Sequence, residues 1–409
     1  MNRARWSVSL GARRHARGMS LIELMIASAI GLLLALAVTG SVMTMGRQFS
    51  VLGSNAGAQA SAQIGLSLID AAARSAGAGF YNNSLQICPT WNAYNGTATV
   101  SNGAVMMPVR ITSGGSNTVS DTLVFTGGGG AKPLSSLPVL DTTTTAAIKV
   151  PNGGNLAAGD LALIGVPGGS TPCTLFQVVG TPTLLSVAAS CGNNATACLS
   201  LAPSAGTGLN PSSGTFSTAP TYGYTSGGSV VGPAVVSRVG TSATGFRQEG
   251  FAIQCNSLVR YNAFVTTSLP ACTASPLGFG TGVDAIATDI VLMHAQYGIS
   301  ANAASDVVTS WVEPSGGTWG SPSASNAALI KAIRLVLVAR SREPEGTLVS
   351  VACTNANSVA NVGPCSFQDA SAPVIDLSGQ TLPTGKTWQN YRYRVHKAVI
   401  PLRNVIWNN

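Results

Sequence analysis

The chain has 409 residues, of which 45% are hydrophobic and only 9% are charged, and its formal net charge is +8 at pH 7. A positive charge of this size can indicate nucleic-acid binding. Here five arginines lie within residues 1–18 and five more basic residues lie within 377–409, so the rest of the chain has a net charge of −2. Because aromatic residues do not interleave with the basic ones, we expect no specific nucleic-acid partner.

A long apolar segment follows the basic leader. Residues 24–46 form a run of 23 residues without a charged side chain, and about 20 helical residues are enough to cross a bilayer. A cleaved secretory signal has a shorter apolar core of roughly 7–15 residues. A plain single-pass anchor explains the length but leaves Glu23 with a cost of a few kcal/mol. Because basic flanking residues stay inside, the leader 1–18 is expected in the cytoplasm and the chain after residue 46 is expected to be exported.

The residues at the start of the apolar run have a specific spacing. Gly18 precedes the apolar Met19, and Glu23 is the fifth residue after the glycine. This spacing resembles the class III signal of type IV prepilins and pseudopilins. The resemblance implies that a prepilin peptidase cleaves between Gly18 and Met19 and methylates the new N-terminus at Met19. It also implies that Glu23 pairs with the N-terminal amine of a neighbouring subunit, which recovers much of the cost of burying a carboxylate.

Helical spacing continues beyond the apolar run. No proline occurs between residues 47 and 76, and Gly77 and Gly79 mark a helix end. We therefore expect one helix over 19–77, roughly 55 residues and ~80 Å long, with its membrane part at 19–46. Gly40 lowers helix propensity by about 1 kcal/mol and is expected to loosen the helix locally. An apolar stripe is expected to pack on a globular domain through Phe49, Leu52, Ala56, Ala60, Ile64, Leu68 and Ala72.

Residues 78–409 have the pattern of strands and turns rather than of helices. One long helix followed by a β-rich, mainly antiparallel domain places the chain in the α+β class. The run 333–341 is apolar on both faces, which predicts a central strand with the last strand of the chain beside it. The expected strands are 104–111, 122–126, 161–166, 175–179, 184–187, 250–255, 257–263, 332–341 and 392–400.

The middle of this domain contains no charged residue from position 161 to position 237. A disordered linker is one interpretation, but disorder usually accompanies low hydrophobicity and high charge. This stretch contains clusters of Leu, Val and Phe and three cysteines. We therefore favour an inserted β-rich lobe at about 127–250, with the four glycines at 127–130 as its near hinge.

All eight cysteines follow the apolar segment, where an oxidising compartment makes disulfides the default. No C-x-x-C pair occurs and no histidine accompanies a cysteine cluster, which argues against structural zinc. Of the many possible pairings, we favour the local pairs Cys255 with Cys272 and Cys353 with Cys365. Pairing Cys191 with Cys198 would then leave Cys88 for Cys173. The disulfide candidates are therefore Cys88, Cys173, Cys191, Cys198, Cys255, Cys272, Cys353 and Cys365.

Residues suited to catalysis or to metal binding are scarce. His294 follows four apolar residues, which predicts a structural histidine, and His396 lies on a basic strand whose face is expected to be solvated. The glycine-rich run 278–282 resembles a phosphate loop only superficially, because no helix with a basic residue follows it. Asp284 and Asp289 could reach one cation but lack a D-x-D loop. We expect no enzyme activity, no catalytic residue, no metal and no cofactor.

Four later stretches together resemble the PilW-type minor pilins: DAAARSAG at 70–77, QYG at 296–298, IRLVLVARS at 333–341 and YRVHKAVIPLRN at 393–404. The resemblance covers about residues 18–80 and 285–409. It implies a minor pilin that primes type IV pilus assembly within a tip complex. The implied partners are prepilin peptidase, other minor pilins, the major pilin, the inner membrane and, less directly, a tip adhesin.

The resemblance also implies a location and leaves alternatives. The protein is expected to be a single-pass inner-membrane protein with its domain in the periplasm, and to reach the pilus tip after assembly. One alternative is a J-type minor pseudopilin of a type II secretion system. A second is a pilus-tip adhesin that displays the uncharged lobe, and a third is a membrane-anchored enzyme, for which the sequence supplies no site.

Overall fold

The computed structural model describes residues 20–82, 85–129, 136–141, 147–151, 156–186, 191, 197–204, 206–212, 234–241, 246–266, 268–269, 272, 279 and 282–406. The leader, Gly18 and Met19 lie outside these residues, as does most of the glycine-rich run 278–282. The chain divides into two compact units, residues 1–53 and 54–409.

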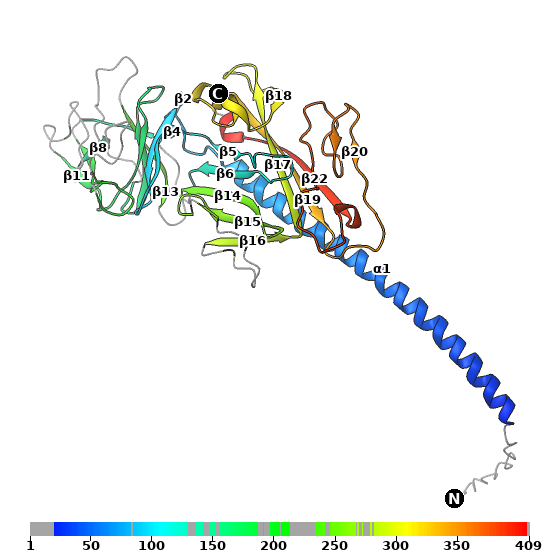
Figure 1. The fold of residues 1–409 in the computed structure, drawn as a ribbon. Helices are drawn as coiled ribbons and strands as arrows, with labels where there is room; N and C mark the ends of the chain where they lie inside the picture. Colours follow the sequence, from blue (N-terminus) through cyan, green and yellow to red (C-terminus); the bar gives the residue numbers. More distant parts are fainter. Residues whose placement is uncertain are drawn as a thin grey trace, which may run out of the picture. The chain divides into compact units, whose positions relative to one another are not determined.

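The helix α1 (Leu21–Ser75) is a single helix of 55 residues. It confirms the long N-terminal helix, and it runs through Gly40 without interruption (Figure 1). Its end has two clear causes. Gly77 adopts a left-handed φ of 78°, which favours glycine. The side chain of Asn404, near the other end of the chain, donates to the carbonyls of Arg74 and Ala76 at 3.1 and 3.0 Å, so the last turn of the helix is capped.

The face of α1 that packs in the domain differs from the expected stripe. Phe49 and Ile64 are 66% and 54% exposed, and Ala56 and Ala60 are also exposed. The buried face is shifted around the helix and consists largely of small residues, because the sheets approach the helix backbone closely. A Cβ added at Gly65 would lie 2.5 Å from the side chain of Leu258. The buried helix residues include Ala58, Ala62, Ile69, Ala72, Ala73 and Ala76.

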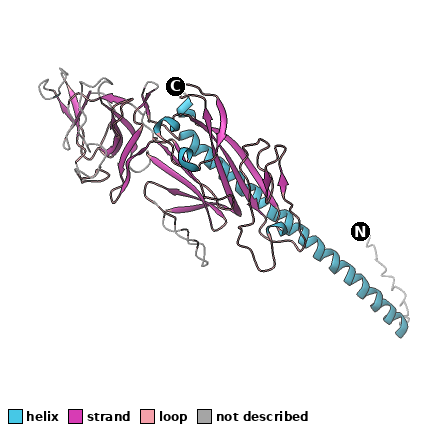
Figure 2. Cartoon of the chain, turned by 45° about the horizontal axis from the view of Figure 1, so that its top comes forward, coloured by secondary structure: helices cyan, strands magenta, loops and turns pink. Residues whose placement is uncertain are grey.

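Two antiparallel sheets share one hydrophobic core with this half of α1 (Figure 2). The C-terminal sheet has the strand order β18-β17-β19-β22, so β19 is internal and the last strand lies beside it, as expected. The middle sheet has the order β16-β15-β14-β6-β5. The bounds are β18 (Val308–Val312), β17 (Ile290–Ser300), β19 (Ile330–Arg340), β22 (Tyr393–Pro401), β16 (Val283–Thr288), β15 (Ser257–Asn262), β14 (Arg247–Gln254), β6 (Thr122–Gly127) and β5 (Val109–Thr112).

The second face of the C-terminal sheet is also covered. Leu292, Val336 and Val338 pack with Ile375 and Leu377 from the segment between β19 and β22. That segment contains β20 (Cys353–Thr354), β21 (Ala360–Asn361) and the 3₁₀ helix η1 (Trp388–Asn390). Burial on both faces explains why β19 is mostly apolar, with Lys331 and Arg334 as buried exceptions. The remaining short helices are α3 (Gly316–Trp319), α4 (Ala324–Ala327) and α5 (Arg403–Ile406).

The lobe is formed by a six-stranded sheet of order β4-β3-β10-β9-β13-β7 and a three-stranded sheet of order β11-β12-β8. We call the first of these the lobe sheet. The chain leaves β6 at Gly127 and returns at Arg247 of β14, and these two residues are direct partners in the ladder. The bounds are β1 (Tyr81–Asn82), β2 (Leu85–Gln86), β3 (Thr90–Tyr94), β4 (Thr99–Val105), β7 (Ser136–Pro138), β8 (Ile148–Pro151), β9 (Asp160–Gly165), β10 (Cys173–Gln177), β11 (Thr183–Leu185), β12 (Cys198–Leu201) and β13 (Val235–Thr241).

Two sequence predictions for this region need correction. The single strand expected at 104–111 is two strands in different sheets, because Pro108 interrupts the run after the buried Met106 and Met107. The lobe sheet is not built from the inserted residues alone. β3 and β4 precede the insertion, and β3 joins the sheet through a parallel pairing with β10.

The charge-free run is bounded by two residues that pair with each other. Asp160 and Arg238 lie immediately outside it, and their side chains are 3% and 1% exposed. Two contacts join the guanidinium to the carboxylate, Nε to Oδ2 at 3.0 Å and Nη2 to Oδ1 at 3.1 Å. Residues Asp160 and Thr241 are partners where β9 and β13 pair, so the ion pair lies beside this ladder inside the lobe.

Four disulfides involve all eight cysteines, in the pairing that the sequence analysis favoured. The paired Cα atoms are 5.4–5.6 Å apart. Cys88 lies just before β3, and Cys173 is the first residue of β10. This disulfide therefore links a strand that precedes the insertion to a strand within it. The pairs are Cys88–Cys173, Cys191–Cys198, Cys255–Cys272 and Cys353–Cys365.

We predict that Arg238→Met destabilises the lobe by about 3–5 kcal/mol, because it leaves the buried carboxylate of Asp160 without its cation. Hydrogen exchange of the amides in β9 and β13 measures the opening free energy of this region. Arg260→Met is the matched control, since the half-exposed Arg260 pairs with Asp284 at 3.4 Å and is expected to contribute less than about 1 kcal/mol. Equal protection in wild type and Arg238→Met would contradict the prediction.

Candidate functional site

The first turn of α1 holds Glu23 in a reciprocal hydrogen-bond pair. The backbone N–H of Glu23 donates to Ser20 Oγ at 3.3 Å, and the backbone N–H of Ser20 donates to Glu23 Oε2 at 3.1 Å. This is a capping box, which satisfies two backbone donors that a helix start leaves unpaired. The S-x-x-E spacing of residues 20–23 was visible in the sequence, so this second role of Glu23 could have been predicted.

The helix that follows Glu23 is long and apolar enough to cross a membrane. The candidate span is Leu21–Met43, with 23 residues, a mean hydropathy of 2.5 and no buried residue in its most apolar stretch. Its large side chains include Leu32 and Leu36, which are exposed. A helix with this much exposed apolar surface requires lipid or other helices around it. Glu23 is therefore a carboxylate at the start of a segment that suits a membrane.

In the C-terminal sheet, Arg334 is a charged side chain buried in the central strand β19. Its guanidinium donates to Asp369 Oδ2 at 2.7 Å and also to the side chain of Gln296 and the carbonyl of Ser371. The guanidinium lies 5.0 and 4.9 Å from the ring centres of Trp311 and Phe367. These contacts satisfy the buried charge on a face of the sheet that also carries Gln296 and His294.

The neighbours of Arg334 belong to three separate segments. Gln296 of β17 donates to Glu313 and to the carbonyl of Ser371. Burial raises the pKa of Glu313. Burial also raises the pKa of Asp369, but the hydrogen bonds and the charge of Arg334 outweigh it and lower that pKa overall. The sequence analysis identified the runs containing Gln296 and Arg334 but not this network, because the partners are 35–38 positions apart in sequence.

His294 is a structural histidine, as its apolar surroundings predicted. It is buried on β17, with Nδ1 3.3 Å from Asp121 Oδ2 and Nε2 3.0 Å from the carbonyl oxygen of Asn117. Asp121 also accepts from the backbone N–H of Ala295 at 2.9 Å. The pair therefore fixes the turn between β5 and β6 on the C-terminal sheet. Burial lowers the pKa of His294, but Asp121 and the carbonyl of Asn117 raise it above its ordinary value overall.

The other residues considered for chemistry are not gathered into one site. Asp284 pairs with Arg260 and Asp289 with Arg342, each at 3.4 Å, so the two carboxylates serve different ion pairs. His396 is half-buried on β22 rather than fully solvated, and burial together with Arg394 lowers its pKa. Among the described residues, no group of three or more His, Cys, Asp or Glu side chains could hold a metal ion.

Comparisons with known protein families match the two ends of the chain. Residues 13–39 match the prokaryotic N-terminal methylation motif, which contains Gly18, Met19 and Glu23. Residues 272–404 match the type IV pilus-assembly protein W family. This second match contains all of the C-terminal sheet and ends at Asn404, the residue that caps α1. No curated protein and no solved structure matches the chain.

A prepilin signal, a membrane-capable first helix and a β-rich domain define the chain as a type IV pilus-related pilin. Such a protein is anchored in a membrane by its first helix, and its motif implies processing by prepilin peptidase and interaction with pilus components. The match over residues 272–404, together with the N-terminal motif, supports a PilW-type pilin.

We predict that the contribution of His294 to stability decreases as pH rises. Its folded pKa is raised, so the stabilisation is complete below its unfolded pKa of about 6.5 and is lost as pH rises through the higher folded pKa. Denaturant unfolding of wild type and His294→Gln between pH 5 and 9 measures this difference in free energy of unfolding. A difference that is constant with pH, or that grows at high pH, would show that the assigned sign is wrong.

Proposed function

We propose that this PilW-type pilin is a minor pilin that primes type IV pilus assembly within a tip complex after cleavage by prepilin peptidase. The observation that carries the proposal is the position of Glu23 in the first turn of an exposed, apolar, membrane-capable helix that a processing motif precedes. Cleavage between Gly18 and Met19 would place a positively charged N-terminus four residues before Glu23. The proposed role is structural and involves no chemical reaction.

The proposed chemistry at Glu23 is charge pairing between subunits. A carboxylate in an apolar bundle of helices is costly unless a cation lies beside it. In an isolated subunit, the carboxylate of Glu23 accepts a hydrogen bond from the N–H of Ser20. On assembly, the methylated amine of Met19 in a neighbouring subunit would supply the missing charge. The pairing favours ordered stacking, because each subunit offers one cation and one anion at a fixed offset along the helix.

The C-terminal sheet and the lobe suggest a division of roles. The family match contains the sheet that packs on α1, which supports an assembly role for this part of the domain. The lobe lies between the adjacent ends of β6 and β14 and outside the matched residues. This arrangement favours a second proposed role, in which the lobe contacts a surface or a partner at the pilus tip. The alternative function is that of a J-type minor pseudopilin in a type II secretion system. Neighbouring genes for other minor pilins would favour the pilus, and a neighbouring secretin operon would favour secretion.

Processing tests the proposal directly. We expect mass spectrometry of the protein from cells to show a chain that begins at N-methylated Met19. Gly18→Ala is expected to leave the precursor uncut, because the peptidase requires the glycine, while Gly31→Ala in the helix serves as a matched control. A wild-type chain that begins at Met1, or one that begins after residue 46, would refute the processing step.

Two variants at Glu23 separate capping from pairing. Glu23→Gln keeps the capping box, because glutamine also accepts from the N-cap N–H, but it removes the charge. We expect both Glu23→Gln and Glu23→Ala to insert in the membrane and both to lose most pili. Ser20→Ala is the matched control: it loses the other half of the cap, worth about 0.5–2 kcal/mol, and should still form pili. Pilus counts by electron microscopy measure the outcome, and normal pili with Glu23→Gln would exclude charge pairing.

Deleting the lobe tests the division of roles. Replacing residues 128–246 by Asn-Gly joins Gly127 to Arg247, which are already ladder partners, through a two-residue hairpin. The deletion removes Cys173, so Cys88→Ser avoids an unpaired thiol. It also removes residues that pack on Trp91, so Trp91→Ser avoids an exposed indole ring. We expect this variant to restore pili in a deletion strain and to lose attachment. Stable protein in the membrane without pili would instead show that the lobe is needed for assembly.

A further inference from the structure

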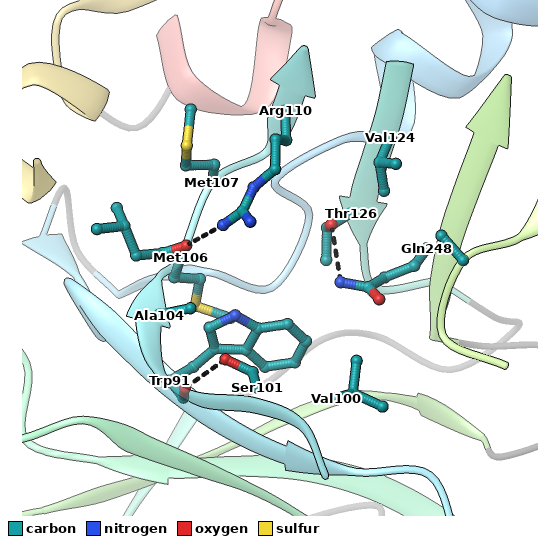
Figure 3. A pocket seen from close by; sticks show the side chains of 12 residues that line it. Trp91, Val100, Ser101, Ala104, Met106, Met107, Arg110, Val124, Thr126 and Gln248 are labelled. Atoms are coloured by element: carbon teal, nitrogen blue, oxygen red, sulfur yellow. Dashed lines mark hydrogen bonds between the residues drawn. The ribbon is translucent and has the colours of Figure 1, made fainter. Parts of the chain in front are cut away.

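A cavity of about 280 Å³ lies where the lobe sheet meets the middle sheet. Its walls come from β3 and β4 on one side and from β5, β6 and β14 on the other (Figure 3). The indole ring of Trp91 forms one side, with the guanidinium of Arg110 and the Gln248–Thr126 pair around the remaining space. Ligand sites commonly occur between structural lobes, where two rigid walls converge. From this cavity we infer a ligand-binding site that is separate from the proposed assembly role.

The polar side chains that line the cavity offer both donors and acceptors, and the guanidinium of Arg110 supplies most of the donors. Gln248 Nε2 donates to Thr126 Oγ1 at 3.4 Å, which leaves the Thr126 hydroxyl hydrogen and the second amide hydrogen of Gln248 to donate. Trp91 is only 5% exposed, and its ring forms an apolar wall of the cavity. Ser101 Oγ donates to the carbonyl of Trp91 at 2.7 Å and keeps only acceptor capacity. The cavity is therefore suited to a ligand rich in acceptor oxygens.

Arg110 sets the sign of the charge. Its Nη2 donates to the carbonyl of Val105 at 3.4 Å, and the described residues that line the cavity include no Asp or Glu. The remaining guanidinium donors can therefore bind an anion in the planar, two-bond geometry that suits a carboxylate. The volume of about 280 Å³ is just below the usual range for ligand pockets, about 300–1,000 Å³. The site thus takes a small hydroxylated carboxylate of about one sugar ring, with its apolar face against Trp91 and Met106.

Saturation-transfer NMR on the full mature chain in detergent micelles tests the inference. The probes are D-glucuronate, D-galacturonate and N-acetylneuraminate, with D-glucose and D-galactose as neutral counterparts. At least one acid should bind saturably, and the neutral sugars should bind at least tenfold more weakly. Arg110→Gln should weaken binding of that acid by roughly tenfold to a hundredfold, since a hydrogen bond to a charged group is lost. Ala104→Phe, which fills the cavity without changing its charge, should abolish binding.

Arg247→Gln is the matched control, because Arg247 neighbours Gln248 on β14 but does not line the cavity. It should change the affinity by less than twofold. Circular dichroism melts of all three variants verify that each is folded. The inference is overturned if none of the three acids binds, if neutral sugars bind equally well, or if Arg110→Gln binds like wild type while folded.

Discussion

Close packing between α1 and two sheets is the constraint on which the rest of this domain depends. At Gly65 the helix backbone comes so near to the middle sheet that an added Cβ would lie 2.5 Å from the side chain of Leu258. At Gly127 an added Cβ would lie 2.4 Å from the carbonyl oxygen of Ser75, at the end of the helix. Small residues at these positions allow the sheets to share one core with the helix, whereas larger ones would force the elements apart.

The C-terminal end of α1 forms hydrogen bonds with two parts of the chain that are distant in sequence. The backbone N–H of Gly77 donates to the carbonyl of Thr126 in β6 at 2.8 Å, and Asn404 caps the last carbonyls of the helix. The helix therefore contacts both the strand from which the lobe departs and the end of the C-terminal sheet. This arrangement explains how the helix can support a large insertion, because the insertion closes on adjacent ladder partners and leaves the shared core intact.

Charged residues are few in this chain, and some of them are held in fixed positions inside the domain. Arg238 with Asp160 lies inside the lobe, and Arg334 with Asp369 and Gln296 lies on the outer face of the C-terminal sheet. Both guanidinium groups are buried, whereas the side chain of Asp369 is 44% exposed; removing the partner of a buried charge leaves a costly unpaired group. Arg110 differs from them, because it faces a cavity that no carboxylate lines. That difference distinguishes a binding group from a structural one.

The sequence alone determined the features that depend on neighbouring residues. The extent of α1 followed from an unbroken apolar and proline-free run, and the central strand followed from the apolar run 333–341, since periodicity acts over a few residues. An insertion was predicted from a charge-free stretch between segments of ordinary composition. Disulfides were expected from the even number of cysteines and the exported compartment.

Tertiary structure decided the features that depend on residues far apart in the chain. The expected helix stripe held at Ala72 and in part at Leu68 but was wrong at Ile64, because the approach of Leu258, nearly two hundred positions later, selects the small-residue face. Strand β17 was missed because Gln296 and Gly298 interrupt its apolar pattern, and their burial depends on Arg334 and Trp311. The pairing of Asp160 with Arg238, and the cavity beside Trp91, likewise exist only where separate strands meet. Local patterns carry no information on such contacts, because their energy comes from the desolvation and packing of groups that only the fold brings together.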